Sequence, residues 1–169
     1  MNPMFQGDSY DLVKRFFCRE LKELGYIVVV DPMFTGDWDG RKEGFLKLIG
    51  ATQVEAAQES QTSTAIFLDP DTGVRAKPSA KHASFDQVAS EAKRHQMVFA
   101  FDQSFARGSG IEAVVAKLLA LKQLDLHAMY YDSHARFLFA ARERAALQSL
   151  KEHLLITGIP EWRLIEHDA

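Results

Sequence analysis

Cysteine is almost absent from this sequence, because Cys18 is its single cysteine and no disulfide can form within the chain. A chain without disulfides suits a reducing compartment. No apolar run approaches the ~20 residues of a membrane-spanning helix. Residues 1–7 lack a basic region followed by an apolar one, so we expect no signal peptide. The simplest expectation is a cytoplasmic protein that does not associate with membranes.

The sequence also lacks an excess of charge of one sign. Its 20 basic and 23 acidic side chains give a net charge of −3, which argues against a protein that binds nucleic acid through bulk positive charge, although a local basic patch stays open. Glycine-rich phosphate loops are missing as well: neither G-x-G-x-x-G nor G-x-x-x-x-G-K followed by Ser or Thr occurs. A dinucleotide-dependent enzyme and a P-loop NTPase are therefore disfavoured.

What the sequence does contain is an alternation of helical and strand patterns. Its 169 residues, 47% of them apolar and 25% charged, suit a single compact domain over residues 1–169. Apolar periodicity predicts helices and β-branched runs predict strands. The expected helices are 10–24, a short one ending at 49, 84–95, 109–121 and 143–155, and the expected strands are 26–30, 65–68, 97–101, 126–131, 136–141 and a short one at 162–165.

Strands that alternate with helices imply right-handed crossovers and a parallel sheet. Residues 126–131 and 136–141 flank a short turn, which predicts an antiparallel hairpin near the C-terminus. Residues 51–64 are polar and alanine-rich, and we expect a helix end followed by a linker there. Residues 69–83 are expected to form a loop. The fold class is therefore α/β, with a mostly parallel sheet and a C-terminal antiparallel hairpin.

Three of the expected strands stop at an acid: Asp31, Asp69 and Asp102. The carboxyl ends of parallel strands meet at one edge of a sheet, where open α/β folds bind ligands. Asp71 lies two residues beyond Asp69, and two carboxylates held together need a cation, a proton or a ligand to offset their repulsion. Such a group can hold Mg²⁺ or Mn²⁺, orient a ribose hydroxyl, or act as a general base.

Acids are also common after strands for purely structural reasons, since they cap helices and form turns. This reading is favoured for Asp31 and for Asp102 taken singly, whereas the close pair of Asp69 and Asp71 favours a site. Nearby basic side chains could hold a phosphate, and His82 is the best histidine for acid–base work. Cys18 is expected to be a packing residue. The candidate phosphate-binding residues are Arg41, Arg75, Lys77, Lys81 and Arg107.

Two segments carry a resemblance to an uncharacterised group of bacterial proteins. Residues 66–73 resemble a strand that ends in Asp-Pro-Asp-Asn-Gly in that group, and residues 101–105 resemble a later strand that ends in a Gln-His-Phe-like triplet. The early Asp11 and Lys14 also look like that group. The resemblance covers roughly residues 11–141, and no reaction is assigned to the group.

More distantly, the layout resembles the Rossmann-like fold of S-adenosylmethionine methyltransferases, which implies a three-layer sandwich. Asp69-Pro70 stands where those enzymes often carry an Asp-Pro-Pro-Tyr motif, and residues 126–141 resemble the strand pair that ends their sheet. Residues 31–36 would correspond to their first cofactor-facing loop, here with one glycine. The resemblance makes S-adenosylmethionine the cofactor to test.

These observations leave three functions open. The first is a methyltransferase-like enzyme acting on a nucleotide or nucleic acid, with Asp69, Asp71 and Asp102 as catalytic residues. The second is a phosphodiesterase or nuclease in which Asp69 and Asp71 bind Mg²⁺ or Mn²⁺ and a bound water is the nucleophile. The third is a non-catalytic binding module. The sequence leaves the oligomeric state open, and the candidate substrate-binding residues are Asp31, Lys81, His82, Gln103 and Arg107.

Overall fold

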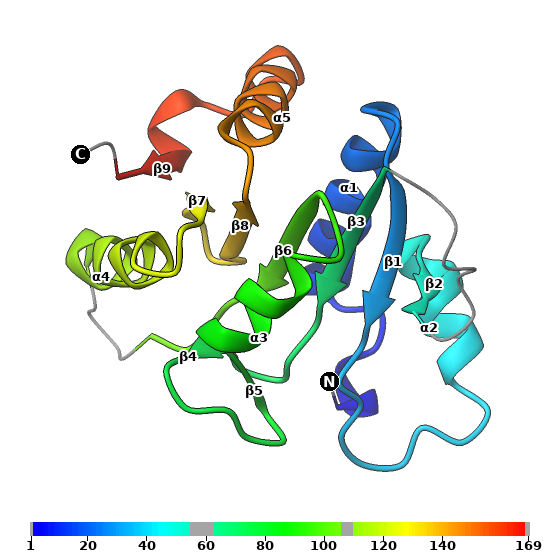
Figure 1. Cartoon of the computed structure of the whole chain (residues 1–169). Helices are drawn as coiled ribbons and strands as arrows, with labels where there is room; N and C mark the ends of the chain where they lie inside the picture. The colour runs from blue at the N-terminus through cyan, green and yellow to red at the C-terminus, as the bar shows by residue number, and fades with distance from the viewer. Residues whose placement is uncertain (1, 55–62, 106–109, 168–169) are drawn as a thin grey trace.

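The computed structural model describes residues 2–54, 63–105 and 110–167 (Figure 1). Within these ranges the helices are α1 (Ser9–Glu23), α2 (Lys42–Ile49), α3 (Phe85–Glu91), α4 (Ile111–Lys122) and α5 (Arg144–Ile156), with short 3₁₀ turns at Pro3–Phe5 and Glu161–Arg163. The strands are β1 (Ile27–Asp31), β2 (Thr52–Gln53), β3 (Thr64–Leu68), β4 (Gly73–Arg75), β5 (His82–Ser84), β6 (Met97–Phe101), β7 (His127–Tyr131), β8 (Phe137–Ala141) and β9 (Leu164–Glu166).

A seven-stranded sheet with the order β2-β1-β3-β6-β8-β7-β9 forms the centre of the molecule. The first four strands in this order are parallel neighbours. The hairpin strand β8 pairs antiparallel with both β6 and β7, and β9 pairs antiparallel with β7. The predicted α/β class, with a mostly parallel sheet and an antiparallel C-terminal part, is confirmed.

Helices cover both faces of the sheet, which gives three layers (Figure 1). On one face α1, α2 and α5 bury side chains such as Phe17, Phe45 and Leu150 against the sheet. On the other face α3 and α4 bury Val88 and Leu118. The central strand β6 is buried along its whole length, as expected for a strand covered on both sides.

The order of the strands reverses between β1 and β3. From β1 the chain passes through α2 to β2 on one side, whereas β3 pairs with β1 on the other side. At such a reversal the connecting segments diverge, and ligands of open α/β sheets bind outside the carboxyl ends of the two strands. The fold therefore directs attention to the loops that follow β1 and β3.

Three local expectations differ from the structure. Residues 69–83 contain β4 and β5, a short parallel pair, which forms because Val74 and Ala83 are both buried and draw the segment onto the sheet. Residues 51–64 contain β2, with residues 55–62 outside the described part. The helix after Ser84 is capped as expected, with Ser84 Oγ accepting from the amide of Gln87 at 3.0 Å, but it ends at Glu91 rather than at His95. The cap expected at Ser109 lies outside the described residues.

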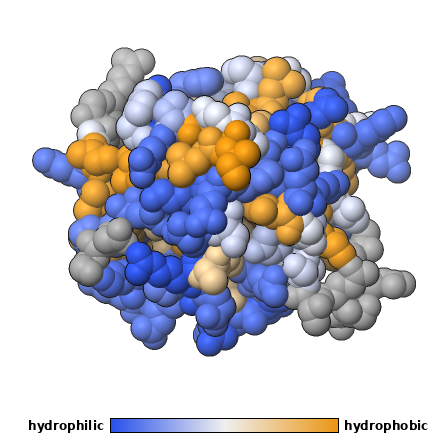
Figure 2. All heavy atoms as spheres, turned by 90° about the horizontal axis from the view of Figure 1, so that it is seen from above, coloured by the Kyte–Doolittle hydropathy of each residue, from blue (hydrophilic) through white to orange (hydrophobic). Residues whose placement is uncertain are grey.

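None of the described helices has both the length and the apolar character needed to cross a bilayer. Seen from above, the apolar groups on the surface are separated by hydrophilic ones (Figure 2). Scattered exposed apolar side chains are normal for a folded protein and carry no functional meaning by themselves.

Candidate functional site: a pocket at the carboxyl edge of the sheet

The three aspartates that follow strands lie at one edge of the sheet. Asp31 ends β1, Asp69 follows β3 and Asp102 follows β6, and these strands are parallel neighbours. The pairing of β1 and β3 extends one residue past β3, since the amide of Asp69 donates to the carbonyl of Asp31 at 3.0 Å. The environments of the three side chains nevertheless differ sharply.

Asp69 is fully buried and meets two charged residues of α1. The ammonium of Lys14 donates to Asp69 Oδ2 and to Asp11 Oδ1, each at 3.0 Å, and all three side chains are buried. Asp11 Oδ2 also accepts from the amide of Gly7 at 2.7 Å. The second oxygen of Asp69, Oδ1, is buried and accepts no hydrogen bond from the described residues. A buried carboxylate oxygen left in this state is costly and is a feature of functional sites.

The charges in this group are coupled. Burial raises the pKa of Asp69, and the ammonium of Lys14 only partly offsets that effect. Burial alone would lower the pKa of Lys14, but the carboxylates of Asp69 and Asp11 outweigh it and raise that pKa. Lys14 is therefore an ammonium ion at neutral pH, and Asp69 holds its proton to higher pH than an exposed aspartate does.

A pocket of about 380 Å³ opens over this group. Its wall consists of the N-terminal turn, the start of α1, the loop after β3 and the residues at the end of β6, so it lies at the carboxyl edge of the sheet by β3 and β6. The size is within the usual range for small-molecule sites. The lining residues are Asn2, Phe5, Asp8, Tyr10, Asp11, Lys14, Pro70, Asp71, Thr72, Lys81, Phe101 and Gln103.

Aromatic rings form part of this pocket. The ring of Tyr10 lies 5.3 Å from that of Phe101, edge to face, and 5.7 Å from the imidazole of His134. Lys14 Nζ lies 5.1 Å from the centroid of the Phe101 ring and 5.5 Å from that of Phe45. The pocket thus combines aromatic side chains with a buried cation and several carboxylates.

The motif after β3, residues 69–73, is hydrogen-bonded to three other segments of the chain. Asp71 Oδ2 accepts from the hydroxyl of Thr35, in the loop after β1, at 2.5 Å. The amide of Thr72 donates to the carbonyl of Lys81, and the carbonyl of Thr72 accepts from the amide of Gln103. Asp71, Lys81 and Gln103, all expected to be site residues, are therefore brought together at the pocket.

Asp102 is placed differently, because its carboxylate is surrounded by donors. Oδ1 accepts from the amides of Val74 and Ser104, and Oδ2 accepts from Lys117 at 2.5 Å and from the hydroxyl of Tyr130. None of the three strand-end aspartates, Asp31, Asp69 and Asp102, is among the residues that line the pocket. The contacts of Asp102 join β4, β6, β7 and α4, so this carboxylate stabilises the packing of these elements.

The remaining expected site residues lie at the margin or elsewhere. Asp31 shares the edge, and its Oδ1 accepts from the amide of Met33 at 3.2 Å. His82 lies on β5 with its Nδ1 at 2.8 Å from the hydroxyl of Ser79, and burial together with the charge of Arg75 lowers its pKa. Arg107 lies outside the described residues.

The sequence expectations missed Lys14, Asp11 and Tyr10 as site residues. Leu12 in the first half of α1 is 57% exposed, and the buried stripe of the helix runs through Asp11, Lys14, Cys18 and Leu21. Two charged residues at helical spacing on the buried stripe of a helix could have indicated this site, because a charged side chain is buried only where it has a partner. Cys18 on the same stripe is a packing residue, and burial raises the pKa of its thiol to about 12.

The described aspartates do not form a metal centre of three side chains. Among the described residues, the carboxylates and imidazoles close enough to share one cation are those of Glu20, Glu23 and His153, at the far end of α1. Asp69 and Asp71 belong to no such group, because Asp69 faces Lys14 and Asp71 faces Thr35.

The loop after β1 is a poor fit to S-adenosylmethionine. Phe34 in this loop packs against Trp38 with the rings tilted by 40° and their centroids 4.6 Å apart, and both rings contact Phe45 of α2. The indole of Trp38 donates to the carbonyl of Thr35 at 3.2 Å. The segment 31–36 thus folds onto α2 and lacks the glycine-rich turn whose amides would face a cofactor.

A larger hollow of about 710 Å³ lies between α4, β7, α5 and β9, and includes His127 and His167. None of the strand-end acids lines this hollow. The smaller pocket is the better candidate because the sheet edge, the buried ion group and the aromatic rings coincide there.

The chain finds no match among protein-family models, curated proteins or solved structures. The functional conclusion therefore depends on the geometry of the pocket itself.

Proposed function

We propose that this protein is an enzyme of methyltransferase-like build that binds a nucleobase, in a nucleotide or a nucleic acid, in the pocket at the carboxyl edge of the sheet. The observation that carries the proposal is the combination of aromatic side chains with the buried Lys14–Asp69 pair beside a pocket at the carboxyl edge of the sheet. The insertion of β8 between β6 and β7 supports the resemblance in build, because the resemblance rests in part on that closing strand pair.

The chemistry of the pocket favours a ring that carries an amino group. Asp8, Asp11 and Asp71 line the pocket, and ionised carboxylates only accept hydrogen bonds. Adenine and cytosine offer an exocyclic amino group as a donor, whereas uracil does not. A planar ring beside Tyr10 would gain about 1–3 kcal/mol from the aromatic contact.

Within such a complex the chain's own residues have definite tasks. Tyr10 and Phe101 hold the ring, and Asp71, fixed by Thr35, orients the amino group. Lys14 lies at the pocket wall, and the carboxyl group of Asp69 behind it holds the ammonium in place.

Titration with nucleoside monophosphates tests this proposal. We expect AMP and CMP to bind at micromolar to millimolar dissociation constants, and UMP to bind about tenfold more weakly or worse because it lacks the amino donor. Calorimetry and the amide NMR signals of residues around Tyr10 and Phe101 give the affinity and the location.

Tyr10→Leu should weaken AMP binding by about tenfold or more, because it removes one aromatic face. Tyr26→Leu is the matched control, since half-buried Tyr26 precedes β1 and does not line the pocket. Equal binding of AMP and UMP, or no binding to the wild type at about 10 mM, would contradict the proposal. S-adenosylmethionine is titrated in parallel, and neither heat nor a thermal shift is expected because of the packed loop after β1.

A further inference from the structure

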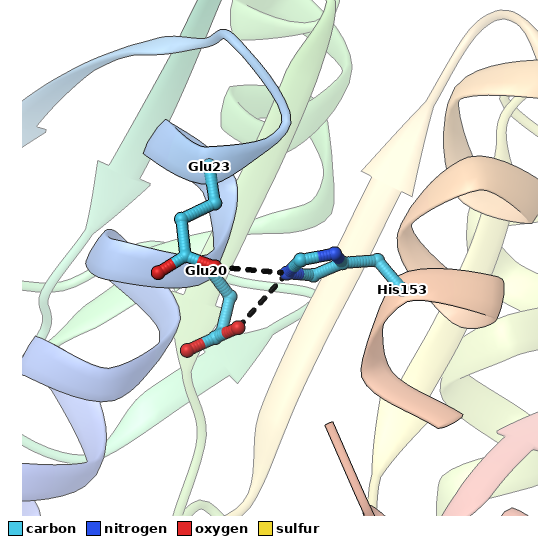
Figure 3. A group of neighbouring side chains, drawn as sticks. All are labelled: Glu20, Glu23 and His153. Atoms are coloured by element: carbon cyan, nitrogen blue, oxygen red, sulfur yellow. Dashed lines mark hydrogen bonds and ion pairs between the residues drawn. The ribbon is translucent and has the colours of Figure 1, made fainter. Parts of the chain in front are cut away.

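At the end of α1 away from the pocket, a second group of polar side chains converges. Glu20 and Glu23 lie one turn apart on α1, and His153 reaches them from the last turn of α5 (Figure 3). His153 Nε2 lies 2.9 Å from Glu20 Oε2 and 3.8 Å from Glu23 Oε2. We propose that Glu20, Glu23 and His153 form a binding site for a divalent transition-metal cation, with Zn²⁺ as the best fit.

The distances suit such a cation. The three ligand atoms lie within 4.8 Å of one another. Zinc binds nitrogen and carboxylate oxygen at about 2.1 Å in a tetrahedral arrangement, which separates neighbouring ligand atoms by about 3.4 Å. The separations from His153 Nε2 of 2.9 and 3.8 Å bracket that value. Small side-chain rotations would therefore complete the three-ligand arrangement.

Burial and charge favour a cation at this place. The side chain of Glu20 is 1% exposed although it carries a carboxylate, and Oε1 accepts from Arg19 Nε at 2.9 Å and from Arg19 Nη2 at 2.6 Å. Oε2 faces the imidazole. Arg19 lies within ion-pair distance of both glutamates and offsets part of their charge, and a divalent ion would balance the rest.

The kind of ligand narrows the choice of metal. An imidazole together with carboxylates suits Zn²⁺ and its neighbours in the transition series, whereas Mg²⁺ and Ca²⁺ prefer an all-oxygen shell. The side chain of Glu23 is 55% exposed, so water can supply the remaining coordination positions. The competing arrangement is a simple ion pair between a protonated His153 and the two glutamates.

A bound cation would link the last turn of α1 to α5. The same helix carries Tyr10, Asp11 and Lys14 of the pocket in its first half. A ligand that binds only the folded state raises the melting temperature in proportion to its binding free energy. The site is independent of the proposed nucleobase pocket, so each can fail without the other.

The test uses tag-free, full-length protein, since a histidine tag would bind zinc itself. Calorimetric titration should give one Zn²⁺ per chain at micromolar affinity or tighter, and Zn²⁺ should raise the melting temperature whereas Mg²⁺ should not. His153→Gln and Glu23→Gln should each lower zinc affinity by about tenfold or more. His127→Gln, which changes an exposed histidine on β7, should leave zinc binding unchanged.

Each outcome decides the proposal. No zinc binding to the wild type at about 1 mM, or unchanged affinity in His153→Gln, would mean that the group is only an ion pair. The exposed position of Glu23 makes Glu23→Gln safe for folding, so this variant decides the question if His153→Gln fails to fold. Unchanged zinc affinity in Glu23→Gln would also overturn the three-residue site.

Discussion

Replacement of Lys14 by methionine should lower the free energy of unfolding by about 3–5 kcal/mol, because it leaves the buried carboxylates of Asp11 and Asp69 without their common partner. Methionine keeps the length and the apolar character of the lysine stem, so packing loss contributes little. Urea denaturation followed by circular dichroism measures the difference. A folded domain is typically stable by about 5–15 kcal/mol, so the loss expected from this one residue is a large fraction of the total free energy of unfolding.

Arg15→Met is the matched control, because it removes a cation from the exposed side of the same helix. It should change stability by about 0.5 kcal/mol or less. Asp69→Asn in the Lys14→Met background should recover part of the loss, since a neutral amide needs no buried counter-charge. If Lys14→Met costs no more than Arg15→Met, the buried ion group does not have the role described here.

Gly73→Ala should lower stability by about 3 kcal/mol or more, from left-handed backbone strain and overpacking together. Gly73 has a φ of +129°, which side-chain-bearing residues rarely adopt. A Cβ there would lie 2.0 Å from Asp102 Oδ1 and 2.8 Å from Asp102 Cα. Neither atom can move without breaking the contacts that Asp102 makes with Val74, Lys117 and Tyr130.

Gly110→Ala gives the comparison for this prediction. A Cβ at Gly110 meets nothing within 4 Å, and its φ of −81° suits alanine. The thermal unfolding midpoint should fall by many degrees for Gly73→Ala and change little for Gly110→Ala. Similar midpoints for the two variants would show that Asp102 and the motif after β3 are not packed as the structure describes.

The sheet could be predicted because its signals are local. The β-branched run before Asp31 and the apolar run before Asp69 each form a strand. The parallel order follows from the intervening helices. The short pair of β4 and β5 could not be predicted, because its strands form through the burial of Val74 and Ala83 against distant parts of the chain.

The candidate site could be predicted only in part. Asp69 and Asp102 follow strands in the same way, yet one faces a lysine of α1 and the other is enclosed by Lys117 of α4 and Tyr130 of β7. Residues 55 positions apart in sequence make the Lys14–Asp69 contact. No local pattern encodes such a pairing, although buried charges on α1 were a usable hint.

A crystal structure of the protein grown with AMP tests the central claim most directly. We expect the adenine ring in the pocket beside Tyr10 and Phe101, with its amino group within hydrogen-bonding distance of a carboxylate such as Asp71. Clear density for AMP at another place, or an empty pocket under conditions where calorimetry shows binding, would contradict the assignment of this edge of the sheet as a nucleobase site.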